Sequence, residues 1–433
     1  MWGFLPPAVS DVFLRAVVTR LLRGDRTALE DTLCSFLGSR AAAAGTSWVV
    51  VLGVLLEELA AHTHGRREVV LPSYSCNEFT KATLLAGLQP RYVDLKPNLA
   101  ADPAAIAAAI GPRTLAAFAI NNVGRESENA RIRALCDQHG VVCVEDATYT
   151  FLGRADHDGR RFGSYGHFAV LNFSEGKIVP VGGGAVVCNH ADGVDAIAAV
   201  RARIGQRPAA STLRELLSLV VYRAGSSRFG YTAYRLLREA TGADLKKRLS
   251  MEPTRADEVG HDLVRDAGGH VVFRPGRARA LKEQTELRPL GRAKQLCGVA
   301  IIDRAAHVRA VRMTRYQAFC RALAGAPRVE ILPYPAAGTC IKAPVVVRAE
   351  VSAAQRSALD RLGVIRGYAT DYPTYGDPAY PSSNRFFDLL FTLPLHRHID
   401  DAAVRDITRA LAALDSPIEG GHTPPVRATE AHR

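Results

Sequence analysis

The sequence predicts an α/β fold, with a large domain whose mainly parallel sheet is flanked by helices and a small C-terminal α/β domain. Between residues 68 and 144, short apolar runs rich in β-branched residues alternate with longer segments of helical periodicity. This alternation is typical of strand–helix–strand units, whose strands lie parallel. After residue 328 the pattern changes to short strand-like runs separated by two helical segments. The 433 residues, 48% of them hydrophobic, are enough for two such domains.

The N-terminal segment 1–34 is predicted to be helical. Apolar residues recur at helical spacing from residue 9 to residue 22, and arginines lie on the opposite side of that helix. We expect the helix to pack on the body of the protein or on a second subunit. Contact with a membrane surface is the less favoured alternative.

A turn of glycine and hydroxyl residues, Gly45-Thr46-Ser47, comes directly before the apolar helical stretch 48–61. The free backbone N–H groups at the start of a helix, together with the helix dipole, can hold a phosphate group. An ordinary serine or threonine N-cap is the simpler and commoner explanation of such a turn. The residues alone leave both interpretations open.

Strand-like runs at residues 68–71, 90–93, 115–120 and 141–144 alternate with helical patterns at 78–86, 103–110 and 129–139. In mainly parallel sheets of this kind, ligands bind beyond the carboxyl ends of the strands. Asp146 lies in the turn that follows the last of these strands, so its carboxylate is expected to point into that region. A carboxylate that only caps the following turn is an alternative of equal weight.

Lys177 lies between two strand-like runs in the segment HFAVLNFSEGKIVPVGGGAVVCN, residues 167–189. Lysine is scarce beside the many arginines, so a lysine in an apolar, glycine-flanked segment is not expected to be mere surface charge. Partial desolvation is expected to lower the pKa of its amine and to free the neutral form that Schiff-base chemistry needs. A lysine that extends its amine into solvent from a strand end is the alternative, given equal weight on this stretch alone.

Residues 192–290 are rich in arginine and leucine and are predicted to form a helical insertion, with helices at 211–224 and 231–240. We interpret its charge as a solvated basic surface. A cover over the active site, or a contact with a lipid or acidic partner, are the alternatives. One long helix is predicted next, at 293–324, with a mild break at Gly298.

The last part of the chain is predicted to form the small domain. Strands are expected at 328–332, 340–347, 363–365 and 389–395, and helices at 353–362 and 400–414. The tail has no periodic apolar face and is predicted to be disordered. The expected organisation is an N-terminal segment (1–34), a large domain (35–290), a long helix with the small domain (291–415) and the tail (416–433).

The composition excludes some classes of function. The formal net charge of +12 comes almost entirely from arginine, which suits recognition of phosphate or carboxylate groups. We find no basic run with interleaved aromatic residues and no metal-ligand spacing, so neither nucleic acid nor a metal ion is expected. The eight cysteines form no CxxC pair, which is typical of reduced cysteines in a cytoplasmic protein. The N-terminal apolar stretch predicts neither a signal peptide nor a membrane-spanning helix.

Several of these segments occur together in the order and at about the spacing found in a known family. They are the glycine–threonine turn, VLPSYSCNEFTKATLLAGLQPRYVD (70–94), EDA (145–147), GSYGHFAVLNFSEGK (163–177), GGGAVV (182–187) and LPLHRHIDDAAVRDITRAL (393–411). On these motifs the chain resembles the DegT-like sugar aminotransferases over residues 35–190 and 290–415. The resemblance implies fold type I of the pyridoxal phosphate (PLP) enzymes, PLP as the cofactor, and a homodimer.

The resemblance also implies roles for individual residues. Lys177 would form a Schiff base with PLP and move the proton between the substrate carbon and the cofactor. Asp146 would pair with the pyridine nitrogen, so that the ring can act as an electron sink. The implied cofactor-binding residues are Gly45, Thr46, Ser47, Cys76, Asp146, Tyr149, Asn172, Ser174, Lys177 and Arg288.

Four of these positions depart from the family's usual residues. Asn172 stands where the family has a phosphate-binding serine, although an amide can still donate a hydrogen bond. Tyr149 stands where the family has a glutamine and is expected to bond the phenolic oxygen of the cofactor instead. Cys76 stands where an aromatic residue usually stacks on the cofactor ring. In the segment that reaches the phosphate of the partner subunit, only Arg288 is able to serve.

The function implied by the resemblance is transfer of an amino group from an amino acid, with glutamate as the expected donor. The expected acceptor is a keto group on a nucleotide-linked sugar. One alternative is a PLP enzyme that acts on a non-sugar ketone or aldehyde in secondary-metabolite or lipid assembly. The other is a catalytically silent relative that binds the cofactor as a regulator.

Overall fold

A computed structural model of the chain describes residues 4–7, 9, 11–174, 176–206, 208–241, 262–278, 287–368 and 372–415. The predicted disordered tail, 416–433, lies outside the described residues. So do residues 242–261 and 279–286 of the predicted helical insertion.

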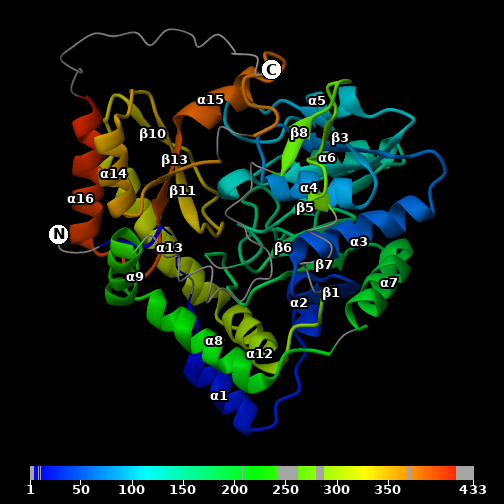
Figure 1. The fold of residues 1–433 in the computed structure, drawn as a ribbon, viewed down its shortest axis with the longest axis horizontal. Coiled ribbons are helices and arrows are strands. Elements are labelled where there is room, and N and C mark those ends of the chain that lie inside the picture. Colours follow the sequence, from blue (N-terminus) through cyan, green and yellow to red (C-terminus); the bar gives the residue numbers. More distant parts are fainter. Residues whose placement is uncertain are drawn as a thin grey trace.

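A seven-stranded sheet forms the centre of the large domain, in the order β1-β7-β6-β5-β4-β2-β3 (Figure 1). Its strands are β1 (Ala41–Gly45), β2 (Glu68–Pro72), β3 (Gln89–Val93), β4 (Thr114–Ile120), β5 (Val142–Asp146), β6 (Phe168–Asn172) and β7 (Gly184–Cys188). The strands from β3 to β6 are parallel, while β7 runs antiparallel to both β6 and β1. The predicted mainly parallel sheet is therefore confirmed.

Helices cover both faces of this sheet. On one face lie α3 (Trp48–Ala61), α4 (Asn77–Leu85) and α7 (Val194–Ile204). On the other face lie α2 (Leu29–Leu37), α5 (Pro103–Ala109), α6 (Asn129–Gln138) and α12 (Arg292–Ile302). Successive strand residues alternate between the two cores: Ala185 and Val187 pack against α2 and α12, whereas Val186 and Cys188 pack against α3 and α7. This alternation explains why the strands are apolar throughout.

The connection to the small domain differs from the predicted single helix at 293–324. The structure has two helices, α12 and α13 (Ala305–Ala322), which separate at Asp303 and Arg304. Gly298 lies inside α12, where a Cβ atom would come within 2.8 Å of Leu29 Cδ1 of α2. The glycine therefore permits close packing of two helices, and the predicted break at this position is wrong.

The small domain has a four-stranded antiparallel sheet in the order β10-β11-β13-β12. The strands are β10 (Val329–Ile331), β11 (Lys342–Val347), β12 (Ile365–Arg366) and β13 (Leu390–Pro394), with helices α14 (Ala353–Arg361), α15 (Pro381–Leu389) and α16 (Asp401–Ala412). Figure 1 shows α12 and α13 running diagonally between the two sheets. The predicted fold class, a large parallel-sheet domain with a small α/β domain, is confirmed, while the exact domain boundaries stay predictions.

The first helix, α1 (Leu14–Leu22), begins five residues later than the sequence predicts. The described residues before it are not helical, and two of them are hydrogen-bonded to distant parts of the chain. The backbone N–H of Leu5 donates to the oxygen of Arg361 at 2.8 Å, and Arg312 donates to the oxygen of Val9 at 2.8 Å. Tertiary hydrogen bonds thus override the helical periodicity of residues 9–13.

The described part of the insertion contains both predicted helices, α8 (Thr212–Gly225) and α9 (Arg228–Thr241). It also contains a hairpin that the sequence analysis missed, β8 (Leu263–Arg265) with β9 (Val271–Phe273). Glu215 anchors α8 to the start of α12, because its carboxylate accepts from the backbone N–H groups of Gly291 at 2.8 Å and Lys294 at 3.2 Å. No helix in the described ranges is long and apolar enough to cross a membrane.

Candidate active site

One edge of the large sheet gathers the predicted site residues. Gly45 pairs with Gly184, and Gly184 pairs with Asn172, so the ends of β1 and β6 and the start of β7 are in register. Asp146, the last residue of β5, pairs with Val170 of β6. The strand order therefore brings groups separated by more than a hundred residues to the same edge, as the rule for parallel sheets predicts.

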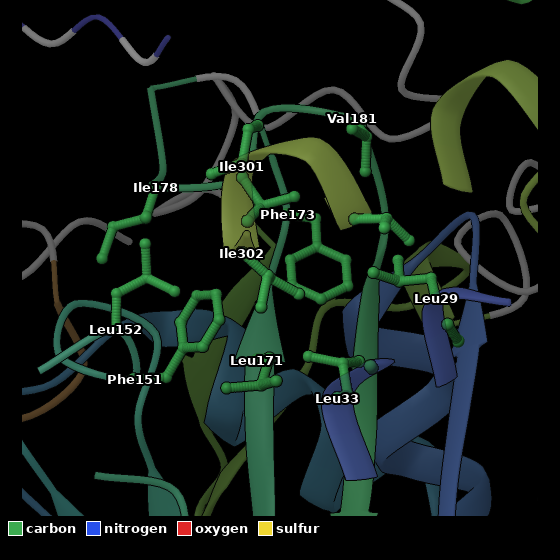
Figure 2. Packing of buried hydrophobic residues seen from close by; sticks show 14 of the residues in the cluster. Leu29, Leu33, Phe151, Leu152, Leu171, Phe173, Ile178, Val181, Ile301 and Ile302 are labelled. Atoms are coloured by element: carbon green, nitrogen blue, oxygen red, sulfur yellow. The ribbon is translucent and has the colours of Figure 1, made fainter. Parts of the chain in front are cut away.

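The loop between β6 and β7, which carries Lys177, is fixed by the core beneath it. Figure 2 shows Phe173, Ile178 and Val181 among the buried side chains of this core, together with Ile301 of α12. Phe173 also exchanges two backbone hydrogen bonds with the glycine run, one of 2.8 Å with Gly183 and one of 2.7 Å with Gly182. Apolar side chains on both sides of the lysine thus hold the loop in place.

The Lys177 amine lies against Tyr149. Its Nζ donates to the tyrosine Oη at 3.0 Å and lies 4.1 Å from the centre of the tyrosine ring. Burial on its own lowers the pKa of Lys177, but Tyr149, Cys76 and Asp146 together outweigh it and raise that pKa above its ordinary value. Desolvation acts in the expected direction, but the expected net lowering of the pKa is wrong, because Tyr149, Cys76 and Asp146 outweigh it.

Removal of the Tyr149 hydroxyl should lower the pKa of Lys177. In Tyr149→Phe the amine loses a hydrogen bond and a neighbour that favours its protonated form, so more neutral amine is present at a given pH. The measurement is the rate at which an amine-selective reagent modifies Lys177, followed against pH by mass spectrometry of its peptide. The midpoint should move to lower pH, while the midpoint for Lys294 in the same samples stays constant. An unchanged Lys177 midpoint would contradict this account.

Asp146 is buried and accepts hydrogen bonds at both its carboxylate and its backbone oxygen. Its Oδ1 accepts from the backbone N–H of Thr148 at 2.9 Å, and its backbone oxygen accepts from Asn121 Nδ2 at 2.9 Å. Burial raises the pKa of Asp146, which the Thr148 bond and the positive charge of Lys177 partly oppose. The bond to Thr148 caps the turn after β5. The alternative considered for this carboxylate, that it caps the following turn, is therefore also present. The sequence analysis missed Asn121 as a residue of the site. Asn121 directly follows β4, just as the turn of Asp146 follows β5.

The turn at Gly45-Thr46-Ser47 begins α3. Ser47 is the N-cap residue, yet its side chain makes no capping hydrogen bond; its Oγ atom is buried and has no hydrogen-bond partner. This geometry does not fit an ordinary N-cap and leaves a buried hydroxyl at the positive end of a fourteen-residue helix. Thr46 instead binds a neighbouring segment: its N–H donates to the oxygen of Arg288 at 2.9 Å, and its hydroxyl accepts from the N–H of Arg288 at 3.0 Å.

The glycine run allows β7 to approach this turn. Gly183 has φ +79°, and a Cβ atom there would lie 2.0 Å from the oxygen of Gly45. A Cβ atom on Gly184 would lie 2.3 Å from the Cβ of Trp48, the first residue of α3. Only glycine satisfies both the backbone conformation and the space at Gly183. The glycine run therefore brings the loop that carries Lys177 close to the turn that carries Ser47.

The remaining predicted residues fall into two groups. Asn172 and Ser174 lie at the same edge, where Asn172 Oδ1 accepts from the N–H of Ser174 at 2.8 Å. Cys76 is the N-cap residue of α4 and interacts electrostatically with Lys177; burial raises the pKa of its thiol to about 11, so it is a neutral group here. The guanidinium of Arg288 has its Nη1 3.5 Å from the oxygen of Pro208.

The small domain contributes a tyrosine that the sequence analysis missed. Tyr368, just after β12, interacts electrostatically with Tyr149, Cys76 and Asp146. Its backbone N–H donates to the hydroxyl of Tyr74 at 3.1 Å, and the two rings have centres 5.0 Å apart. A single tyrosine in a Gly-Tyr pair carries no recognisable pattern, so only the contact between the two domains reveals it.

Comparison with known proteins agrees with this architecture. Residues 17–220 match the model of the DegT/DnrJ/EryC1/StrS aminotransferase family. A curated relative from Pseudomonas aeruginosa, UDP-2-acetamido-2-deoxy-3-oxo-D-glucuronate aminotransferase, is 30% identical over 193 residues, which are 43% of this chain and 51% of the relative. L-glutamine:2-deoxy-scyllo-inosose aminotransferase from Streptoalloteichus tenebrarius is 32% identical over 127 residues, which are 29% of this chain and 30% of the relative. The chain thus spans at most about half the length of these relatives.

The likeness in structure extends over nearly the whole chain. The structure of Spr1654 from Streptococcus pneumoniae in its PLP form superimposes with a TM-score of 0.66, covers 95% of this chain and 98% of its own, and is 16% identical in sequence. At that identity the match shows the fold. Residues 17–220, which contain Lys177 and all seven strands of the large sheet, therefore match the model of the DegT/DnrJ/EryC1/StrS aminotransferase family, and the chain as a whole has the fold of the fold type I PLP enzymes.

Proposed function

We propose that the protein is a PLP-dependent aminotransferase, which moves an amino group from an amino acid to a keto group. One observation carries the proposal: the amine of Lys177, the buried carboxylate of Asp146 and the buried hydroxyl of Ser47 come from three different strand ends and lie at one edge of the sheet. The family of residues 17–220 and the PLP form of the similar structure support it.

The residues present fit PLP. The cofactor needs a phosphate site, a carboxylate for its ring nitrogen and an amine for its aldehyde. The partnerless Ser47 Oγ at the start of α3 suits the phosphate, because it can donate there beside the free N–H groups of the first helical turn. Asp146 and Lys177 supply the other two groups, and their mutual electrostatic interaction indicates that they lie near one another.

Each residue has a task that follows from its chemistry. Bound PLP supplies an aldehyde that joins amines and a ring that withdraws electrons from them. The Asp146 carboxylate holds a proton at the ring nitrogen. Lys177 would hold the cofactor through its aldehyde and, once released, its amine would move a proton between the amino-bearing carbon of the substrate and the former aldehyde carbon of the cofactor. Tyr149 orients the Lys177 amine through the bond of 3.0 Å and would bond the phenolic oxygen of the cofactor.

The substrate assignment rests on the names of the relatives. The Pseudomonas enzyme is named for a UDP-linked keto-sugar, which supports a nucleotide-linked keto-sugar as the acceptor. The Streptoalloteichus enzyme is named for 2-deoxy-scyllo-inosose, which supports the alternative of a ketone without a nucleotide. We propose glutamate as the donor, with glutamine as the second candidate. We further propose a cytoplasmic homodimer in which Arg288 reaches the cofactor phosphate of the partner subunit.

The absorbance spectrum tests the function. Protein incubated with PLP should gain a visible band, and glutamate or glutamine should bleach it as the amino group moves to the cofactor. Addition of a nucleotide-linked keto-sugar, or separately of 2-deoxy-scyllo-inosose, should restore the band and identify the class of acceptor. A band that no amino donor bleaches would overturn transamination in favour of a silent cofactor-binding protein.

Loss of the Ser47 hydroxyl should weaken PLP binding. A hydrogen bond to a charged group contributes about 1.5–3 kcal/mol, so the Kd of Ser47→Ala should rise roughly ten- to a hundredfold. Titration of the visible band with PLP measures this Kd. Ser164→Ala is the matched control, because the Ser164 hydroxyl bonds the oxygen of Arg161 away from the turn at 2.7 Å. If Ser47→Ala and the control bound PLP with equal affinity, the phosphate would not bind at this turn.

A further inference from the structure

Helices α8 and α9 carry the same apolar pattern on their outward sides. In both, exposed apolar residues recur at positions i, i+4, i+7, i+8 and i+11. We call these residues the α8–α9 face: Leu213, Leu217, Val220, Val221 and Ala224 in α8, and Phe229, Ala233, Leu236, Leu237 and Ala240 in α9. The two helices follow one another along one border of the molecule (Figure 1).

The exposure of this face is unusually high for large apolar side chains. Leu213 is 78% exposed, Leu217 62%, Phe229 85% and Leu236 55%. Single exposed apolar residues are ordinary, but two helical stripes of them indicate a surface that another body covers.

The opposite sides of both helices already bind the body of the protein. On α8, Leu219 is fully buried and Glu215 is bonded to the start of α12. On α9, Thr232 Oγ1 accepts from the N–H of Phe4 at 2.9 Å, and Arg235 donates to Asp360 at 2.7 Å. The helices cannot turn the apolar stripes inward without breaking these contacts.

The exposed charges around the face are mainly arginines. Arg214 is exposed beside the stripe of α8. Of the two carboxylates on the described parts of these helices, Glu215 is buried, and Glu239 is the one exposed carboxylate, 3.6 Å from Arg235. Helix α1, which packs on α12 as α8 does, adds the exposed apolar residues Val18 and Leu22, with arginines at 15, 23 and 26 exposed beside them.

We propose that the α8–α9 face docks on the surface of a bilayer that contains anionic phospholipid. Apolar stripes of two helices with an arginine border match the acyl–headgroup boundary and its negative charge. A second copy of this chain fits less well, because an isologous contact would bring arginine borders of equal charge together. The helices would lie in the plane of the surface, and the enzyme would meet its substrates next to a membrane.

Co-sedimentation of the full-length protein with vesicles tests the proposal. The protein should bind vesicles of phosphatidylcholine mixed with phosphatidylglycerol, and binding should weaken on neutral vesicles and at high salt. A glutamate in each stripe, Leu217→Glu with Leu236→Glu, should reduce the bound fraction at least about tenfold, because charge replaces apolar area that the bilayer would bury. Arg214→Gln should reduce the preference for anionic vesicles and leave the residual binding to neutral ones unchanged.

Val194→Glu is the matched control, since Val194 is 37% exposed at the start of α7, away from α8 and α9 (Figure 1). This variant should bind vesicles as the parent does. The far-ultraviolet circular dichroism of all variants should be the same, which would separate lost docking from lost folding. Absence of binding by the parent would overturn the proposal. So would an oligomer of the parent, seen by sedimentation without lipid, that Leu217→Glu with Leu236→Glu dissociates, because the face would then join two copies.

Discussion

Replacement of Lys177 by alanine is expected to abolish amino transfer. The variant has no amine at the position that Tyr149 and Asp146 surround, so it can neither bind the cofactor covalently nor carry the proton. The single-turnover rate with glutamate should fall at least about a thousandfold, and the visible band should be absent. Stopped-flow absorbance of protein loaded with PLP measures both.

The control for this variant is Lys96→Ala. Lys96 is a partly exposed lysine that pairs with Glu128 on the surface, so its loss should leave the band and the rate unchanged. If Lys177→Ala kept the parent's band and rate, the lysine would have to be a structural strand-end residue, which was the alternative at the level of sequence.

Replacement of Asp146 by asparagine is expected to separate catalysis from stability. The amide oxygen can still accept from the N–H of Thr148, but the side chain no longer holds a positive charge at the ring nitrogen. The rate of the half-reaction with glutamate should fall by roughly two to three orders of magnitude, the range that a positioned proton contributes. Single-turnover kinetics of the loaded protein measure this fall.

The thermal stability of the same variant without added PLP should be equal to or higher than that of the parent at neutral pH. Burial raises the folded-state pKa of Asp146, so the folded protein binds this proton more tightly than the unfolded chain does. The carboxyl group therefore favours folding in acid, and that contribution is lost as the pH rises through its folded-state pKa. The neutral amide avoids this loss. A variant that was both slower and clearly less stable at neutral pH would indicate a structural role instead.

Much of the architecture could be predicted because its signals are local. The apolar run that became β5 and the polar turn after it placed Asp146 at a strand end, and the alternation of strands with helices implied parallel pairing. The same reasoning put Lys177 in the loop after β6. The resemblance to a family then implied the roles of these two residues, which stay predictions, and residues 17–220 match the model of that family.

The sequence by itself therefore determined the fold class and the strand ends that carry Asp146 and Lys177, because periodicity and turn residues act over a few positions. Only the tertiary structure decided what depends on distant neighbours. It set the direction of the Lys177 pKa through Tyr149 and brought Tyr368 of the small domain to the site. It also divided the predicted single helix into α12 and α13 at residues 303–304, without a break at Gly298. Helix α8 has apolar residues on two sides, and the tertiary structure decided which side is buried and which is exposed. Such a helix gains stability only from the apolar side that packs against another part of the protein.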